Sequence, residues 1–195
     1  MFSQSFAIKI SFSFLVTSLF KISDAIFSVQ CPVQSDWKHR ADTTGSNVDV
    51  KDKTGETPLH LACRKGNEKI VKLFIDNGAS IDAKTKKDKM RPFHEACRNG
   101  HRNVVDILLE NNVKYDKQNE QGWTGLFFSC ANGFNDIVKI ILNRKPDVNR
   151  TAKDRITALH AASMNSHKDV VNTLLEKKAN VNFADVLGVT PLYKS

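Results

Sequence analysis

The sequence lacks the short motifs by which enzymes are usually recognised. It has no glycine-rich phosphate-binding loop, no serine nucleophile elbow and no His-Glu-x-x-His zinc motif. It also has no recurrent pair of carboxylates in a setting that suggests general acid–base catalysis. These absences argue against an enzyme, so we predict no catalytic residues and no cofactor.

The N-terminal part lacks an apolar run long enough to cross a membrane. Residues 10–20 form an uncharged run of eleven residues between Lys9 and Lys21. A helix needs about 20 residues to span a bilayer. We therefore predict no transmembrane span here.

The same run has the length of the apolar region of a signal peptide, and Ser23 and Ala25 supply the small residues of a cleavage site. Against this, only one basic residue precedes the run, and Asp24 adds a charge beside the site. Residues 1–30 are interpreted either as a signal peptide or as an apolar leader that is disordered or packs on the first repeat. Residues 31–44 are interpreted as an irregular linker.

Cysteine is scarce, with four in the chain. Three of them, Cys63, Cys97 and Cys130, lie 34 and 33 residues apart, as in neighbouring units of a repeat. Equivalent residues of stacked repeats lie ~10 Å apart, whereas the Cα atoms of a disulfide lie closer than about 7 Å. We interpret these thiols as small buried core residues, which fits a reducing compartment better than secretion.

What the sequence does contain is a repeat. Its second positions are residues 58, 92, 125, 158 and 191, at spacings of 34, 33, 33 and 33. The recurring segments are Thr57-Pro-Leu-His60, Arg91-Pro-Phe-His94, Thr124-Gly-Leu-Phe127, Thr157-Ala-Leu-His160 and Thr190-Pro-Leu-Tyr193. A fixed period of this size marks a stacked repeat array rather than a domain with one central core.

Each unit is predicted to contain two short helices. In the first unit, Thr57 suits the N-cap and Pro58 the first helical position. This helix should end at Gly66, which can take the left-handed cap. A second helix should begin near Glu68 and end at Asn77-Gly78. Its apolar positions recur in the later units, so burial must come from stacking on neighbouring units.

This pattern resembles the ankyrin repeat. The resemblance rests on Thr-Pro-Leu-His-x-Ala with a 33-residue period, Gly66 between two helices and Gly78-Ala79 before an extended segment. It covers about residues 45–195 and implies an all-α repeat solenoid of helix-turn-helix-hairpin units. We expect full repeats at about 52–84, 85–117, 118–150 and 151–183. A fifth repeat is expected to be cut off inside its first helix at Ser195, as in a fragment or a truncated product.

Several positions depart from the repeat pattern. The connection over residues 84–91 has one extra residue and no turn glycine, and repeat three has Gly125 and Phe127 in place of proline and histidine. Ser166 stands at the glycine position between the helices of repeat four. The position of Gly78 is taken in later repeats by Asn112, Lys145 and Lys178. Since lysine tolerates left-handed geometry less well than glycine, we expect repeats three and four to be less ideal.

Three repeated histidines are candidates for metal binding or catalysis. His60-x-x-Cys63 and His94-x-x-Cys97 have the spacing of ligand pairs, and His160 lacks even a cysteine partner. A structural zinc site needs four converging ligands, whereas each pair stands alone on its repeat. We predict no metal site. The resemblance implies instead that each histidine braces its turn through hydrogen bonds to the backbone.

The net charge of +8 comes entirely from residues 51–195, because residues 1–50 carry four basic and four acidic side chains. Basic residues cluster where the resemblance places hairpin fingers, which form the concave binding surface together with the first helices. Trp123 beside the third finger is a candidate anchor, since tryptophan is enriched at interface hot spots; packing against the neighbouring turn is the alternative. The predicted partner-binding residues are Lys84, Lys86, Lys87, Lys89, Arg91, Lys117, Trp123 and Arg155.

We therefore predict a non-enzymatic protein–protein interaction module, an intracellular scaffold or adaptor whose partner has an acidic surface. A regulatory ankyrin segment of a larger channel or enzyme is the alternative, and a purely solubilising role of the lysines is the simplest one. Nucleic-acid binding is disfavoured because few aromatic residues stand among the lysines. The predicted location is the cytoplasm, with the nucleus as an alternative, or the exterior if residues 1–25 are a signal peptide.

Overall fold

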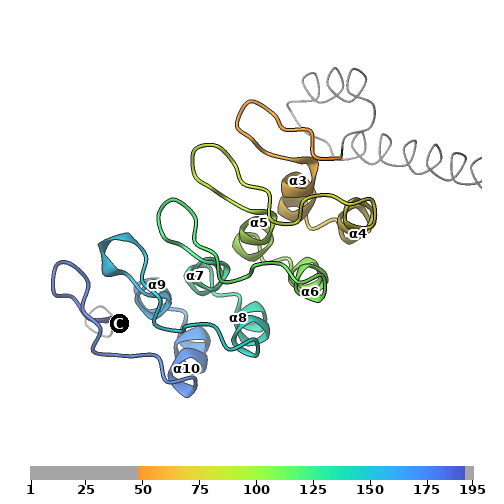
Figure 1. The fold of residues 1–195 in the computed structure, drawn as a ribbon. Coiled ribbons are helices and arrows are strands. Elements are labelled where there is room, and N and C mark those ends of the chain that lie inside the picture. Colours follow the sequence, from red (N-terminus) through yellow and green to blue (C-terminus); the bar gives the residue numbers. More distant parts are fainter. Residues whose placement is uncertain (1–47, 192–195) are drawn as a thin grey trace, which may run out of the picture.

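The computed structural model describes residues 48–191, and in this part eight α-helices form four pairs (Figure 1). The first helices of the pairs are α3 (Pro58–Lys65), α5 (Pro92–Arg98), α7 (Gly125–Ala131) and α9 (Ala158–Met164). The second helices are α4 (Glu68–Asp76), α6 (Arg102–Glu110), α8 (Asn135–Leu142) and α10 (Lys168–Glu176). A short 3-10 turn, η1 (Lys153–Arg155), lies in the loop before α9.

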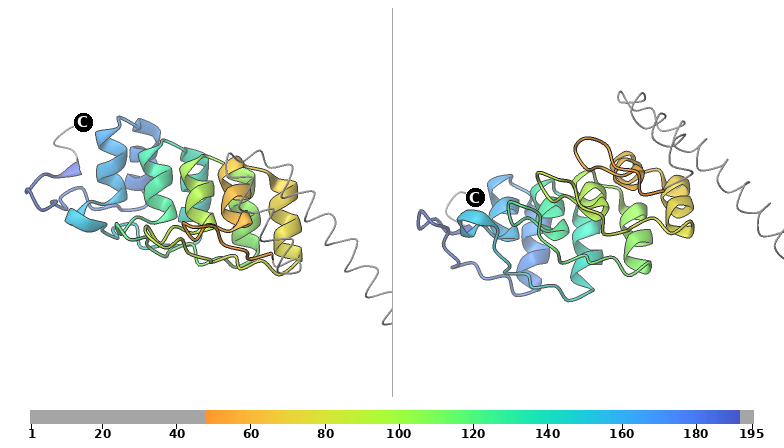
Figure 2. Two further views of the ribbon diagram at one scale, coloured as in Figure 1. Left: turned by 90° about the horizontal axis from the view of Figure 1, so that it is seen from above. Right: turned by 45° about the horizontal axis from the view of Figure 1, so that its top comes forward.

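The helices stand in two rows. Figure 1 shows α3, α5, α7 and α9 in an inner row, from which the long loops project, and α4, α6, α8 and α10 in an outer row. Within each row every helix packs on the next one, and both views of Figure 2 show the same side-by-side stacking. This arrangement confirms the predicted all-α repeat solenoid.

The predicted helix signals act where expected. Thr57 is the N-cap residue of α3 and Pro58 its first residue, while Gly66 ends the helix with φ 71°. Asn67 then caps α4, because its side chain accepts a hydrogen bond from the amide of Ile70 at 3.2 Å. The short turn between the two helices places their apolar sides against each other.

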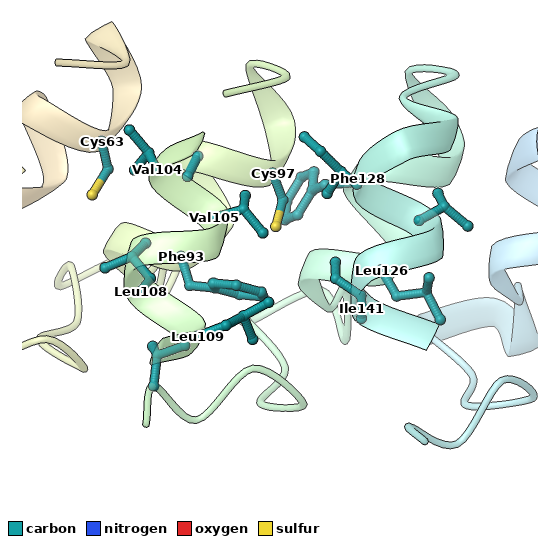
Figure 3. Close-up of a cluster of buried hydrophobic side chains, with 14 of the residues drawn as sticks. Cys63, Phe93, Cys97, Val104, Val105, Leu108, Leu109, Leu126, Phe128 and Ile141 are labelled. Carbon is teal, nitrogen blue, oxygen red and sulfur yellow. The ribbon is translucent and has the colours of Figure 1, made fainter. Parts of the chain in front are cut away.

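The hydrophobic core is a continuous layer that runs through the stack. Fully buried side chains come from both rows, including Leu59 of α3, Phe74 of α4 and Ile141 of α8. Figure 3 shows the middle of this layer, where Phe93 and Cys97 of α5 point toward α7. Burying a side chain of this size contributes about 1.5–3 kcal/mol, and here the burial depends on the neighbouring pair.

Phe93 and Gly125 fit each other across the boundary between repeats two and three. α5 has Phe93 where α3 has Leu59, and α7 begins with glycine where α3 and α5 begin with proline. A Cβ atom added at Gly125 would lie 2.8 Å from Cδ1 of Phe93, nearer still to its Cε1, and 3.0 Å from Sγ of Cys97. The phenyl ring, only 1% exposed, therefore fills the space that a side chain at position 125 would need.

Left-handed backbone is held by glycine alone in repeat one, by glycine and larger residues in repeats two and three, and by larger residues alone in repeat four. Gly78 has φ 79°, and the equivalent Lys145 and Lys178 have φ 56° and 62°. Ser166, at the position of Gly66, has φ 58°. Left-handed geometry costs roughly 1–2 kcal/mol for a residue with a Cβ. Repeat four therefore departs most from the glycine pattern, as expected, whereas repeat three has one such residue, Lys145, and repeat two has two, Lys89 and Asn112.

The loops before the inner helices form narrow hairpin-like turns, which we call fingers. Fingers one to five comprise residues 52–56, 85–90, 119–123, 152–156 and 185–189. In each, the first amide donates to the last carbonyl, at 2.7–3.0 Å. One further backbone hydrogen bond joins each finger to the next, from Lys86 to Thr54, Glu120 to Asp88, Lys153 to Gln121 and Val186 to Asp154. The fingers therefore form one connected edge beside the inner helices.

Finger four lacks two features that stabilise the turn in finger three, a side-chain hydrogen-bond acceptor and a left-handed glycine. In finger three, Oδ1 of Asn119 accepts from the amides of Gln121 and Trp123 at 3.0 and 2.9 Å, and Gly122 takes the left-handed position. Finger four has Ala152 and Arg155 at the positions of Asn119 and Gly122. Its backbone is left-handed at two successive residues, with φ 61° at Asp154 and 59° at Arg155. Finger four is the most strained turn of the described edge.

Replacing Ala152 by Asn and Arg155 by Gly should stabilise the protein by about 1–2 kcal/mol, because it restores the side-chain acceptor and removes a left-handed Cβ. Urea unfolding of the double variant measures the gain. The matched control makes the reverse changes at the equivalent positions of finger three, Asn119→Ala with Gly122→Arg. This control variant should be less stable than the wild-type chain. An unchanged unfolding midpoint in A152N/R155G would contradict the assignment of strain to this turn.

The predictions for residues 1–30 and 31–44 lie outside the described residues, and so does the part of the fifth repeat after Pro191. The described chain ends at Thr190 and Pro191, directly after finger five.

Candidate partner-binding surface

Finger two carries the densest group of basic side chains. Lys86, Lys87 and Lys89 are all exposed at its tip. Lys89 has left-handed backbone with φ 53°, and its Nζ donates to the carbonyl of Lys86 at 2.8 Å. Because the amide of Lys86 also binds finger one, the tip is held from two sides. The three lysines therefore sit on a defined turn, with Asp88 as the acidic residue among them.

The other predicted basic contacts are spread along the edge. Lys84 and Lys117 are exposed in the segments that lead to fingers two and three. Arg155 is exposed in finger four, and its guanidinium carbon lies 5.2 Å from the ring centroid of Phe183. The structure thus brings three of the predicted cations together at one tip and leaves Lys84, Lys117 and Arg155 outside that tip.

Arg91 does not belong to the exposed set. It is the N-cap residue of α5 and is only 5% exposed. Thr57 and Thr157, at the same position of their repeats, are buried as well. Its Nη1 donates to the carbonyl of Gln118 at 3.1 Å, and its Nε lies 4.0 Å from Oδ1 of Asp82. The prediction that Arg91 contacts a partner is wrong, because the N-cap position points the side chain into the boundary between repeats.

Trp123 packs on the inner helix of its own repeat. Its ring is parallel to that of Phe127, with centroids 5.5 Å apart, and meets the ring of Phe128 edge-on at 5.6 Å. Trp123 and Phe127 are both half-buried, whereas Phe128 is buried. Trp123 thus has an internal packing role and still presents part of its surface at the end of finger three.

The repeated histidines brace the structure. The amide of Thr57 donates to Nδ1 of His60 at 3.2 Å, and Nε2 of His60 lies 3.1 Å from the carbonyl of Met90. His94 and His160 make the equivalent pair of bonds, their Nε2 atoms reaching the carbonyls of Lys117 and Val189. The predicted brace is confirmed. It also extends to the next finger from His60 and His160, and to the segment before the next finger from His94, which the sequence did not reveal.

This geometry requires a neutral ring. Nδ1 accepts from an amide, so the proton is on Nε2, which donates to the carbonyl. Burial lowers the pKa of His60, and burial lowers that of His94 to about 4. A group held neutral in this way is a structural residue rather than an acid or base poised near pH 7.

Cys63, Cys97 and Cys130 are free and fully buried, as predicted. Burial raises the pKa of the Cys97 and Cys130 thiols far above the ordinary range. Inert, protonated thiols of this kind act as small core residues. Cys31 lies outside the described residues.

Two further findings concern residues 48–191 alone. This part holds no group of three or more His, Cys, Asp or Glu side chains that could bind a metal ion. None of its helices is long and apolar enough to cross a membrane.

The family follows from comparison with known sequences. A family model described as "Ankyrin repeats (3 copies)" matches residues 38–119 and again residues 111–185. The two matches together span more than half of the chain. The chain belongs to the ankyrin-repeat family. Ankyrin repeats are generally protein–protein interaction modules.

Two curated relatives are similar to this ankyrin chain over a segment of about one repeat. Delta-latroinsectotoxin-Lt1a of Latrodectus tredecimguttatus is 49% identical over 41 residues, which is 21% of this chain and 3% of the relative. Alpha-latrotoxin-Lt1a of the same organism is 45% identical over 40 residues, covering 20% of this chain and 3% of the relative. This chain therefore spans only a small part of either relative.

A second set of histidines, missed in the sequence, joins adjacent ankyrin repeats. Nε2 of His101 lies 2.9 Å from the carbonyl of Arg64, and Nε2 of His167 lies 3.1 Å from that of Ala131. Each ring thus satisfies a carbonyl at the C-terminal end of the inner helix of the previous repeat. Their shared position, directly before the second helix, is the signal that could have identified them.

The first two ankyrin repeats are also joined by charges on the inner helices. Nε and Nη2 of Arg64 donate to the two carboxylate oxygens of Glu95 at 3.1 and 3.3 Å, and Nη2 also contacts Glu56. These residues line a hollow of about 430 Å³ between fingers one and two and the inner helices. Lys87 and Arg98 line it as well.

Proposed function

We propose that this chain is a non-enzymatic ankyrin-repeat scaffold or adaptor that binds a protein with an acidic surface along its fingers and inner helices. The observation that carries the proposal is the connected edge of fingers, each bonded to the next through its backbone. A connected edge presents side chains from several repeats at low conformational cost, which favours binding. The lysine tip of finger two supplies positive charge at one end of it.

The buried thiols support a location in a reducing compartment, the cytoplasm or the nucleus. The local similarity to the two latrotoxins supports the repeat fold and carries none of their action to this chain, because it covers 3% of each. The proposed activity is therefore binding alone.

Changing Lys86, Lys87 and Lys89 to Glu should weaken partner binding by about tenfold or more, because like charges then face the acidic surface. Binding of partners purified on the wild-type chain is measured by titration at about 50 mM and about 300 mM salt. The matched control changes Lys69, Lys72 and Lys139 to Glu, since these exposed lysines lie on outer helices. Equal binding by both triple variants, or affinity that salt leaves unchanged, would refute the role of finger two.

A further inference from the structure

Four of the five described fingers are closed by the side chain of their first residue. In fingers one and five, Oδ1 of Asp52 and Oδ1 of Asp185 each accept from two amides of the same finger at 2.8–2.9 Å. Finger three is closed in the same way, and in finger two Oγ1 of Thr85 accepts from the amide of Met90 at 3.0 Å. Finger four begins with Ala152, whose methyl group cannot accept a hydrogen bond. Of the described fingers it alone lacks this closure.

The backbone of finger four is also the least favourable of the described edge. Asp154 and Arg155 are left-handed in succession, whereas each of the other fingers has a single left-handed residue. The hydrogen bond from the amide of Val186 to the carbonyl of Asp154 is 3.1 Å long, against 2.8–2.9 Å for the other three links between fingers. Finger four should therefore open locally at a lower cost in free energy than its neighbours.

The tip of finger four carries the side chains that a protease specific for basic residues recognises. Lys153 and Arg155 are both exposed there. Exposed loop tips are preferred sites of proteolysis, and a tight turn must open before its peptide bond can enter an active site. Finger two provides an internal comparison, because Asp88-Lys89-Met90 has the same order of acidic, basic and apolar residues as Asp154-Arg155-Ile156. The two tips thus differ mainly in how firmly the turn is closed.

We propose that finger four is a proteolytic processing site, cut between Arg155 and Ile156 by a protease that cleaves after basic residues. Hydrolysis adds one water molecule across this peptide bond, so that the carbonyl carbon of Arg155 becomes a carboxylate and the nitrogen of Ile156 becomes a free amine. Finger four would stay bonded to finger three, through the amide of Lys153 and the carbonyl of Gln121, but would be separated from its own helix α9. The cut therefore divides the array inside repeat four.

Limited digestion of the full chain with trypsin, at a low ratio of protease to chain, tests the proposal. Among the peptide bonds of residues 48–191, the bond after Arg155 should be cut first. Mass spectrometry should then identify one fragment that ends at Arg155 and one that begins at Ile156. The bond after Lys89 should be cut later, although finger two exposes three lysines. Exposure of basic side chains alone predicts the opposite order.

Two matched variants separate turn closure from the choice of basic residue, because both keep every lysine and arginine. Ala152→Asn supplies the missing acceptor and should slow cleavage after Arg155 by about fivefold, leaving cleavage after Lys89 unchanged. Thr85→Ala removes the acceptor that closes finger two. It should speed cleavage after Lys89 by about fivefold and leave cleavage after Arg155 unchanged.

An earliest cut at another bond of residues 48–191 would overturn the proposal, as would complete digestion without accumulation of the fragment that ends at Arg155. Cleavage of A152N after Arg155 at the wild-type rate, or of T85A after Lys89 at the wild-type rate, would show that closure of the turn does not control cleavage. None of these results affects the binding test with Lys86, Lys87 and Lys89, so failure of the proposed function is measured separately.

Discussion

Gly125→Pro should lower the free energy of unfolding by about 1–3 kcal/mol, although proline begins α3 and α5 at the same position. Proline is well suited to the first residue of a helix, so the backbone alone predicts no loss. The added atoms would collide with the buried ring of Phe93. Phe93→Leu makes room, and G125P should then cost little in the double variant. Urea unfolding of the wild type, both single variants and the double variant measures the coupling.

Ala158→Pro is the matched control, because it makes the same change at the start of α9. The preceding repeat has Leu126 at the position of Phe93, so no ring occupies the space there. A158P should be neutral or slightly stabilising. The steric explanation would be wrong if G125P is as stable as wild type, or if F93L leaves the destabilisation by G125P unchanged. In that case the Phe93 ring would not be the reason that position 125 requires glycine.

The features that the sequence predicted well are those decided within one repeat. Thr57, Pro58 and Gly66 act through their own backbone geometry, so their roles as cap, first residue and terminator follow from residue type alone. The period then extends these assignments to every unit. The brace made by His60 is equally local, because its turn partner lies three residues away.

The features that the sequence missed lie between repeats. His101 reaches the carbonyl of Arg64 across 37 residues, and Arg91 reaches that of Gln118 across 27. Such contacts depend on the rotation and spacing of adjacent units, which a 33-residue period does not specify. For the same reason the exposure of Lys86 was predictable from its turn, whereas the burial of Arg91 was not.

Lowering the pH from about 7 to about 5 should cost about 2 kcal/mol of stability through His94 alone. Burial is the main cause of its folded pKa of about 4, and Arg91 and His60 lower the pKa further. The unfolded value is near 6.5, so the unfolded chain binds the proton first as pH falls. The contribution is therefore complete above pH 6.5 and declines until the folded pKa is reached. Urea unfolding at several pH values between about 7 and about 5 measures the decline in the range where exposed carboxylates stay largely ionised.

His94→Gln separates titration from packing. The variant loses the ring and is expected to be less stable at every pH, but its stability should change less between about pH 7 and about pH 5. In the wild-type chain, the NMR signal of the His94 ring should keep its neutral position to about pH 5 and titrate near pH 4. A midpoint near 6.5, or equal pH dependence in H94Q, would show that the ring accepts a proton within the folded stack. In that case the bond from the Arg91 amide to Nδ1 would have to break without loss of the fold, and the brace would be a weaker link between repeats than its geometry indicates.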